Sequence, residues 1–281
     1  MKTKLSILLL ITFFYSCNSQ KKNKTDLNEL NLNSNVKIII ENTYNAIQIS
    51  TKIEKGTIID EFGTFKNYKI KFNQLGNITE EYNDKYMGGL IIKSYNDNNK
   101  LIEYKHFYND TLTNHFKYFY DNNGYLSKME GYYFEKLSDI YKYINDNKGN
   151  VVQLTITDSD GDFDSKTENK FDEKNNKIES IRYNSDKSIN FKAEYSYDNF
   201  SNITIERNYQ FNESEIDEWT TTSRYDKFNN VIEELMNSSN NKVRKKVFKY
   251  KFDKFNNWIE RVVIENDIPI TITERDIEYY Q

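Results

Sequence analysis

Residues 225–231 read YDKFNNV and carry the pattern that decides the fold: an aromatic residue, Asp or Asn, two or three further residues, Gly or Asn, and finally an aliphatic residue. The same pattern begins again at residues 72, 95, 120, 171, 197 and 252, and a looser copy with one extra residue begins at Ile144, so the copies lie 23 to 28 residues apart. Self-similarity at a nearly constant period is the sequence signature of a repeat architecture. The chain of 281 residues is therefore expected to repeat one structural unit about eight times.

Each copy of the pattern predicts a β-hairpin. A type I turn that is closed by a residue with positive φ joins two antiparallel strands, and an Asp or Asn at the turn entry can accept hydrogen bonds from the backbone ahead of it. Such a loop places the aromatic residue across from the apolar residue, as with Tyr197 and Ile203 or Phe252 and Trp258. The residues expected at positive φ are Gly76, Asn99, Gly124, Asn175, Ser201, Asn229 and Asn256.

The composition agrees with an all-β chain. There are 23 Tyr and 18 Phe residues, whereas the alanines are only Ala46 and Ala193. Aromatic residues favour strands and alanine favours helices, so a helical bundle is excluded. The formal net charge is −4, without the basic surplus that nucleic-acid binding requires, so no nucleic-acid partner is expected.

The repeated pattern resembles the YD (RHS) repeat family of bacterial surface and toxin proteins, over roughly residues 68–280. The chain departs from that family by lacking the Gly-Arg that often opens each unit and by using Asn in place of most glycines. The resemblance implies tandem antiparallel β-hairpin repeats that form one long twisted sheet or open solenoid. With eight units, we expect the sheet to stay open and not to enclose another domain.

One β-repeat domain is expected over residues 36–281. Residues 36–67 are expected to form an N-terminal β cap, with a short helix over 41–47 as an alternative, and the hairpin repeats fill 68–267. Residues 268–281 alternate well and predict a closing strand.

The N-terminus resembles a bacterial lipoprotein signal. Lys2 and Lys4 precede an apolar run too short to span a membrane, and Ser16-Cys17 stands at the expected cleavage point. We expect residues 1–16 to be removed and residues 17–35 to form a flexible tether with a lipid on Cys17. The alternative is an ordinary signal peptide with a chance cysteine. Asn18 differs from the Asp that resembles an inner-membrane retention signal, which favours an outer-membrane lipoprotein, facing the periplasm or on the cell surface.

A cluster of acidic residues surrounds Gly161. Carboxylates on alternate residues, with a glycine for a sharp turn, can wrap oxygen ligands around Ca²⁺. The alternative is a solvated loop between two strands, and no other cofactor is expected. The candidate calcium ligands are Asp158, Asp160, Asp162 and Asp164.

Catalytic motifs are missing from the sequence. No nucleophile elbow, phosphate loop or dinucleotide-binding glycine pattern is present, and His106 and His115 are interpreted as ordinary strand residues. A glycosidase needs two carboxylates in unlike environments, whereas the glutamates after the turns repeat once per unit and have equivalent environments. These glutamates are expected to form cross-strand ion pairs with lysines such as Lys71, Lys170 and Lys251. These glutamates are Glu80, Glu103, Glu179, Glu233 and Glu260.

Several tyrosines crowd into consecutive strands of the middle repeats. Exposed flat rings can stack on sugar rings or form a protein contact surface, and the alternative is that the rings are the core. We therefore expect a non-enzymatic, lipid-anchored cell-envelope protein that acts as a binding or scaffold module for protein or glycan. The alternative is a cell-envelope carbohydrate-active hydrolase, which would need a deep pocket. The candidate binding residues are Tyr118, Tyr120, Tyr132, Tyr133, Tyr141 and Tyr143.

Overall fold

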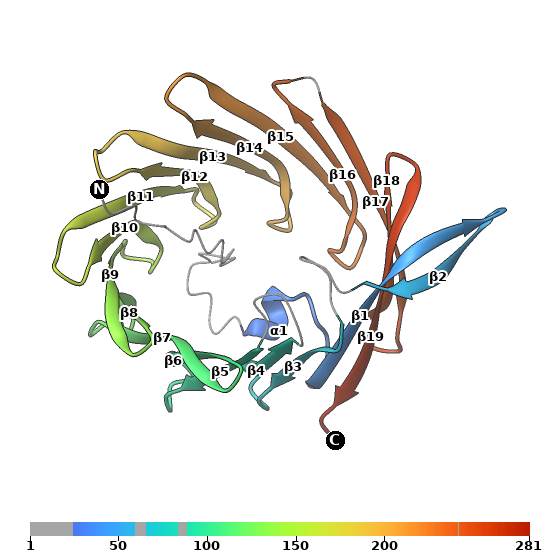
Figure 1. Ribbon diagram of the computed structural model, residues 1–281, viewed down its shortest axis with the longest axis horizontal. Helices are drawn as coiled ribbons and strands as arrows, with labels where there is room; N and C mark the ends of the chain where they lie inside the picture. Colours follow the sequence, from blue (N-terminus) through green and yellow to red (C-terminus); the bar gives the residue numbers. More distant parts are fainter. Residues whose placement is uncertain (1–24, 60–65, 84–88, 241) are drawn as a thin grey trace.

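The computed structural model describes residues 25–59, 66–83, 89–240 and 242–281. These residues form one short helix and nineteen strands (Figure 1). The elements are α1 (Asp26–Glu29), β1 (Val36–Ile49), β2 (Lys52–Ile58), β3 (Tyr68–Phe72), β4 (Ile78–Asn83), β5 (Gly89–Tyr95), β6 (Leu101–Tyr108), β7 (Thr111–Tyr120), β8 (Leu126–Tyr133), β9 (Lys136–Asn145), β10 (Val151–Asp158), β11 (Phe163–Phe171), β12 (Lys177–Tyr183), β13 (Ile189–Tyr197), β14 (Ile203–Phe211), β15 (Ile216–Tyr225), β16 (Val231–Ser238), β17 (Val243–Phe252), β18 (Trp258–Glu265) and β19 (Ile268–Tyr279).

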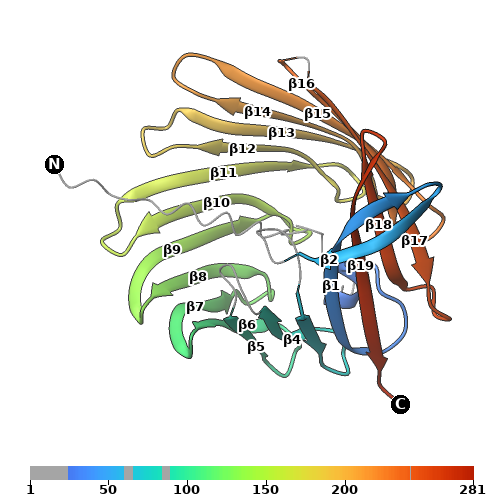
Figure 2. The same cartoon turned by 45° about the vertical axis from the view of Figure 1, so that its right-hand side comes forward.

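The strands form a closed antiparallel barrel. From β3 to β19 each strand pairs with the next one along the chain, and β1 lies between the two ends of that series. Ile39 of β1 is paired with Ile70 of β3 on one side and with Ile277 of β19 on the other. The ring therefore contains 18 strands, while β2 forms a hairpin with the far half of β1 and projects from the ring (Figures 1 and 2).

The expectation of an open twisted sheet or solenoid is wrong. Residues 36–49, which were expected to form a cap with a helix over 41–47 as the alternative, are one continuous strand that closes the ring. The curvature has a local source, because the pairing shifts by one residue beside every repeated turn, for example at Tyr197 and at Tyr225. Such β-bulges bend a strand and increase its twist, and closure removes the exposed edges that an open sheet would present.

The predicted turns are confirmed. Asn229 has a φ of 63°, and its N–H donates to the carbonyl oxygen of Asp226 over 3.1 Å. The Asp226 carboxylate accepts hydrogen bonds from the backbone N–H groups of Phe228 at 2.8 Å and Asn230 at 2.9 Å. The other residues expected at positive φ adopt it, namely Gly76, Asn99, Gly124, Asn175, Ser201 and Asn256.

One face of every strand points into the barrel. Leu27 and Leu32 lie in the segment of α1, which is inside the ring (Figure 1), and they pack against Ile39, Ile70 and Phe72. These three side chains therefore mark the inner wall. Paired residues on neighbouring strands point to the same face of the sheet. The register of the strands therefore shows which residues point into the barrel around the whole ring.

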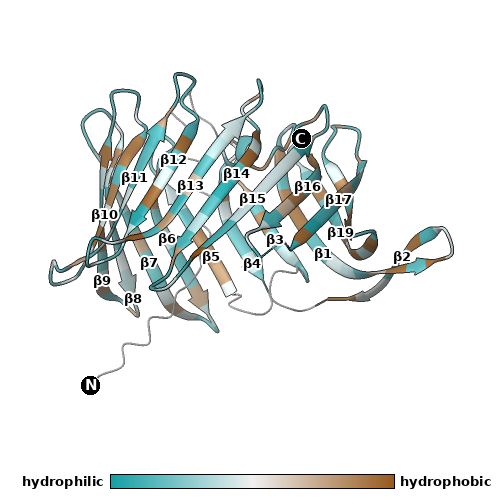
Figure 3. Cartoon of the chain, turned by 90° about the horizontal axis from the view of Figure 1, so that it is seen from above, coloured by the Kyte–Doolittle hydropathy of each residue, from teal (hydrophilic) through white to brown (hydrophobic). Residues whose placement is uncertain are grey.

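The outer wall carries the predicted cross-strand ion pairs. Lys71 and Glu80 lie 2.7 Å apart, as do Lys170 and Glu179, and Lys251 and Glu260 lie 2.9 Å apart. The prediction of glutamate–lysine pairs across the strands is confirmed at these positions. Figure 3, a side view, shows hydrophilic residues along the middle of the strands as well as at their ends.

The segment before β1 is bound to the end of the barrel where the repeated turns lie. The Leu27 N–H donates to the Gly76 carbonyl at 3.0 Å, and the Asn31 side chain donates to the Phe228 carbonyl at 2.6 Å. The described part of the expected tether thus makes contacts with distant turns. Cys17 and the expected signal sequence lie outside the described residues. Within the described ranges, no helix is long and apolar enough to cross a membrane.

Candidate binding site on the inner wall

The six candidate tyrosines do not form one surface. Tyr118 is buried in a cluster with Tyr104, Phe116 and Met129 on the inner wall. Three more candidates pack at the edge of this cluster, namely Tyr120, Tyr141 and Tyr143.

The remaining two candidates lie elsewhere. Tyr132 is on the outer wall, where its hydroxyl donates to Glu130 at 2.8 Å and its ring centroid lies 5.5 Å from that of His115. Tyr133 is half-exposed at the end of β8, and its ring contacts Phe134. The tyrosines are therefore divided between an inner cluster and two separate positions.

Several tyrosines of the repeat have a role that was not predicted from the sequence. The hydroxyl of Tyr120 donates to the carbonyl oxygen of Leu101 at 2.7 Å, and the hydroxyl of Tyr197 donates to that of Lys177 at 2.6 Å. In each case a turn's first residue is bonded to the last residue of the preceding turn. The signal in the sequence was the frequent choice of Tyr at the first position, where Phe would supply the same ring without a hydroxyl.

The acidic cluster is a turn of the same kind as the others. The Asp158 carboxylate accepts hydrogen bonds from the N–H groups of Asp160 at 3.0 Å and Asp162 at 2.9 Å. Gly161 closes the turn with a φ of 91°. Across the described part of the chain, no three His, Cys, Asp or Glu side chains are grouped so that they could hold a metal ion. Calcium binding by Asp158, Asp160, Asp162 and Asp164 therefore stays a prediction.

The two histidines have different surroundings. His106 and His115 lie on the paired strands β6 and β7, at positions one residue out of register, so they point to opposite faces. His115 Nε2 lies 2.8 Å from a carboxylate oxygen of Glu103, which also pairs with Lys105. The structure does not bring the histidines together.

Two open grooves lie between neighbouring turns, with volumes of about 390 and 710 Å³. The smaller one is lined by Asp172 and Asp198. Burial acts to raise the pKa of each carboxyl group, but hydrogen bonds from Asn176 and Asn202, respectively, outweigh it and leave both pKa values below the ordinary range. The two carboxylates are thus in like environments, whereas acid–base chemistry on a glycosidic bond needs unlike ones.

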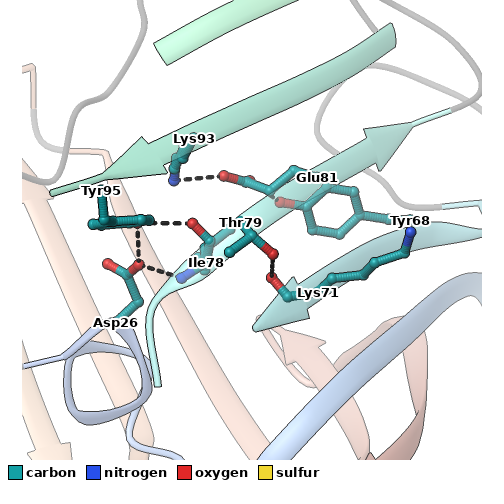
Figure 4. A network of polar contacts seen from close by, with 8 residues as sticks. All are labelled: Asp26, Tyr68, Lys71, Ile78, Thr79, Glu81, Lys93 and Tyr95. Carbon is teal, nitrogen blue, oxygen red and sulfur yellow. Dashed lines mark hydrogen bonds and ion pairs between the residues drawn. The ribbon is translucent and has the colours of Figure 1, made fainter. Parts of the chain in front are cut away.

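A polar network fixes the inner wall beside α1 (Figure 4). Tyr68 donates to one oxygen of Glu81 at 2.5 Å, and Lys93 lies 2.7 Å from the other. Burial and the Glu81 carboxylate raise the pKa of Tyr68 far above its ordinary value, so Tyr68 stays protonated and acts as a donor. Both oxygens of Glu81 are thus occupied by contacts within the wall.

The same network holds the segment of α1. The Asp26 carboxylate accepts hydrogen bonds from the Ile78 N–H at 2.6 Å and from the Tyr95 hydroxyl at 3.2 Å (Figure 4). Tyr95 also donates to the Ile78 carbonyl at 2.7 Å. Because these groups satisfy one another, we assign this network a structural role.

An arginine pair elsewhere on the inner wall is not fully satisfied. Arg275 donates from Nε to Glu41 at 2.6 Å, and its guanidinium carbon lies 3.4 Å from the centre of the Trp258 ring. The guanidinium carbon of Arg261 lies 5.0 Å from the same ring. Nη1 of Arg275 and Nε of Arg261 are buried without a hydrogen-bond partner.

The electrostatics of this group are unusual for a protein interior. The side chains of Arg275 and Glu41 are only 10% and 4% exposed. Burial lowers the pKa of Arg275, Glu41 opposes that effect, and the positive charge of Arg261 adds to it. Two cations thus lie close together, and one of them, Arg275, is paired with a carboxylate. This site was not predicted from the sequence, in which its only signal is Trp258 at a position where most repeats have an aliphatic residue.

Comparisons with known proteins found only weak similarities to solved structures. No model of a protein family and no curated protein matches the chain. A porin-like protein from Bacteroides uniformis is similar over 88% of this chain and 98% of its own, with 11% identity and a TM-score of 0.45. A porin-like protein from Bacteroides vulgatus is similar over 88% and 99%, with 9% identity and a TM-score of 0.40. A TcdB2-TccC3-Cdc42 structure is similar over 81% of this chain and 15% of its own, with 10% identity and a TM-score of 0.30. At these values the likeness carries no ligand, activity or location to this chain.

Proposed function

We propose that this chain is a lipid-anchored protein of the outer membrane whose barrel stands in water and serves as a non-enzymatic binding module. The lipid on Cys17 attaches the protein, on the periplasmic side or at the cell surface. The ligand, a glycan or a protein segment, binds to the inner wall.

The charged outer wall is the observation that carries this proposal. Ion pairs occupy strand positions around the ring, and an arginine or lysine facing lipid at the middle of a bilayer costs about 2–4 kcal/mol. In water the same pairs cost nothing, because exposed ion pairs are close to neutral in free energy. The pairs on β8, β11 and β13 illustrate this, namely Lys128–Glu130 at 2.9 Å, Lys166–Glu168 at 2.7 Å and Lys192–Glu194 at 2.8 Å.

The inner wall supports the binding role. A ring of 16 to 18 strands is wide enough to leave an aqueous channel, so side chains that line it can meet a ligand. Tyrosines at the edge of the inner cluster offer apolar rings there, and the arginine pair offers unsatisfied donors. Apolar surface combined with a few directed polar groups is the usual make-up of a ligand site.

Fractionation of a Cys17→Ser variant tests the proposal. A barrel whose outer wall faces water needs no detergent, so the variant is expected in the soluble fraction, while the wild-type protein sediments with membranes. The soluble variant should unfold in one cooperative transition in detergent-free buffer. A variant that still sediments with membranes, or that aggregates unless detergent is present, contradicts the proposal.

A further inference from the structure

We propose that Arg261 and Arg275 form a binding site for the carboxylate group of a ligand inside the barrel. The inference rests on the proposed function, because it names the chemistry of the ligand that the inner wall binds. The site is assembled from β1, β18 and β19, the strands at which the ring closes.

Unsatisfied donors mark the position of the ligand. The side chain of Arg275 is nine-tenths buried, and its Nη1 has no hydrogen-bond partner. Arg261 has a second such donor at Nε, and its half-buried side chain lies on the inner wall, so the exposed part of it faces the lumen. A buried donor without a partner is destabilising, and more so when it is charged, so an acceptor at this place is favoured.

Charge selects the class of ligand. The two arginines carry two positive charges and Glu41 carries one negative charge, so one further negative charge balances the group. A carboxylate supplies one charge and two acceptor oxygens that match the guanidinium fork. A phosphate dianion would exceed the balance by one charge. The site therefore suits a carboxylate better than a phosphate.

Trp258 and Glu41 position the arginines before the ligand arrives. The indole ring lies against the guanidinium of Arg275, and the Glu41 carboxylate holds its Nε at 2.6 Å. Arg261 of β18 is paired with Thr273 of β19. Thr273 lies two residues before Arg275 on the same strand, so both arginines lie on the same face of the sheet. Arginines that are already oriented lose little side-chain entropy on binding, which favours affinity.

Fluorescence of Trp258 provides a direct readout. The chain has two tryptophans, so Trp219→Phe in the soluble Cys17→Ser protein leaves Trp258 as the reporter. The protein is titrated with sodium D-glucuronate, sodium acetate, sodium phosphate and D-glucose, with sodium chloride keeping the ionic strength constant. Glucuronate and acetate are expected to change the emission with saturation, whereas glucose and chloride are not.

Variants locate the effect. Arg261→Gln is expected to raise the dissociation constant of glucuronate at least tenfold, and Arg261→Lys, which keeps the charge without the fork, should weaken binding to a smaller extent. Arg182→Gln is the matched control, because Arg182 lies on the inner face of β12, far from the site. It should leave the dissociation constant unchanged within twofold. Melting temperatures of all variants show whether they are folded.

Each outcome decides the proposal. Tighter binding of glucuronate than of acetate identifies an acidic sugar as the source of the carboxylate, and equal binding identifies a simple carboxylate. Absence of a saturable change with either anion overturns the proposal. Equal or tighter binding of phosphate, or equal weakening by Arg182→Gln, overturns it as well. If neither anion binds, the fractionation result for Cys17→Ser is unaffected. Failure of the carboxylate site is therefore distinguishable from failure of the proposed function.

Discussion

The hydroxyl of Tyr225 donates a 2.8 Å hydrogen bond to the carbonyl oxygen of Ile203, which ends the turn of the preceding repeat. Tyr250 makes the same bond to Val231 at 2.7 Å. Burial raises the pKa of the Tyr250 hydroxyl to about 12, so it remains a donor under ordinary conditions. A tyrosine hydroxyl thus joins each of these two turns to the one before it, from the first residue of the repeat at Tyr225 and from two residues earlier at Tyr250.

Removal of this hydroxyl should destabilise the barrel. Tyr225→Phe is expected to lower the free energy of unfolding by about 1 kcal/mol, because the Ile203 carbonyl loses its partner while the ring stays in place. Urea denaturation measures the change. Tyr209→Phe is the control, since its hydroxyl makes no hydrogen bond within the described residues, and it should change stability by less than about 0.5 kcal/mol. Equal effects would show that the bond contributes nothing.

Backbone conformation at the turns gives a second prediction. Asn256 has a φ of 64°, a region that a β-branched residue adopts only with strain. We expect Asn256→Val to cost about 1–2 kcal/mol, whereas Asn256→Gly should stay within about 0.5 kcal/mol of the wild-type protein. Thermal unfolding compares the two variants at one position. Similar melting temperatures for both would contradict the assigned turn geometry.

Ion pairs on the outer wall predict sensitivity to acid. The hydrogen bond from Lys170 lowers the pKa of Glu179, and the one from Lys245 lowers that of Glu233. A carboxylate with a lowered pKa binds its proton more weakly in the folded state, so its contribution is complete above the unfolded-state pKa of about 4.3 and is lost as the pH falls below it.

The melting temperature should therefore hold steady from pH 7 to about pH 5 and decline below pH 4. In Glu179→Gln the pair with Lys170 cannot titrate, so this variant should start lower and decline less. A decline of the same size in both proteins would assign the acid sensitivity to other groups.

The acidic turn offers a fourth prediction. If Asp158, Asp160, Asp162 and Asp164 bind calcium, added Ca²⁺ should raise the melting temperature more than sodium chloride does at equal ionic strength. Asp158→Asn should keep the turn, since the Asn73 amide oxygen accepts the equivalent bonds in the first repeat. A rise with Ca²⁺ alone, lost when Asp160 and Asp162 are both changed to Asn, would establish a calcium site.

Local patterns in the sequence predicted local structure well. The turn residues, the pairing of Tyr197 with Ile203 and the glutamate–lysine pairs all depend on residues within about ten positions of one another. The closure of the ring does not depend on such neighbouring residues, because Ile39 pairs with Ile277 near the other end of the chain. Alternation separates two faces of a strand but does not say which one points inward until the ring is closed.

The candidate binding site was missed for the same reason. Glu41 and Arg275 are 234 positions apart, and neither belongs to the repeated pattern. The predicted tyrosines were selected by their density along the chain, whereas the register divides them between the two walls. Where a function depends on two distant strands, the local pattern contains no signal for it.

We propose that the outer wall of the membrane-anchored protein faces water, and adjacent residues of β13 test this orientation directly. Lys192 lies on the outer wall in an ion pair with Glu194, and Ala193 is fully buried on the inner wall. In membranes that contain the anchored protein, a polar maleimide should label Lys192→Cys without detergent and Ala193→Cys only after unfolding. If Lys192→Cys is shielded in membranes and becomes reactive only when detergent removes the lipid, the outer wall faces the bilayer and the account is wrong.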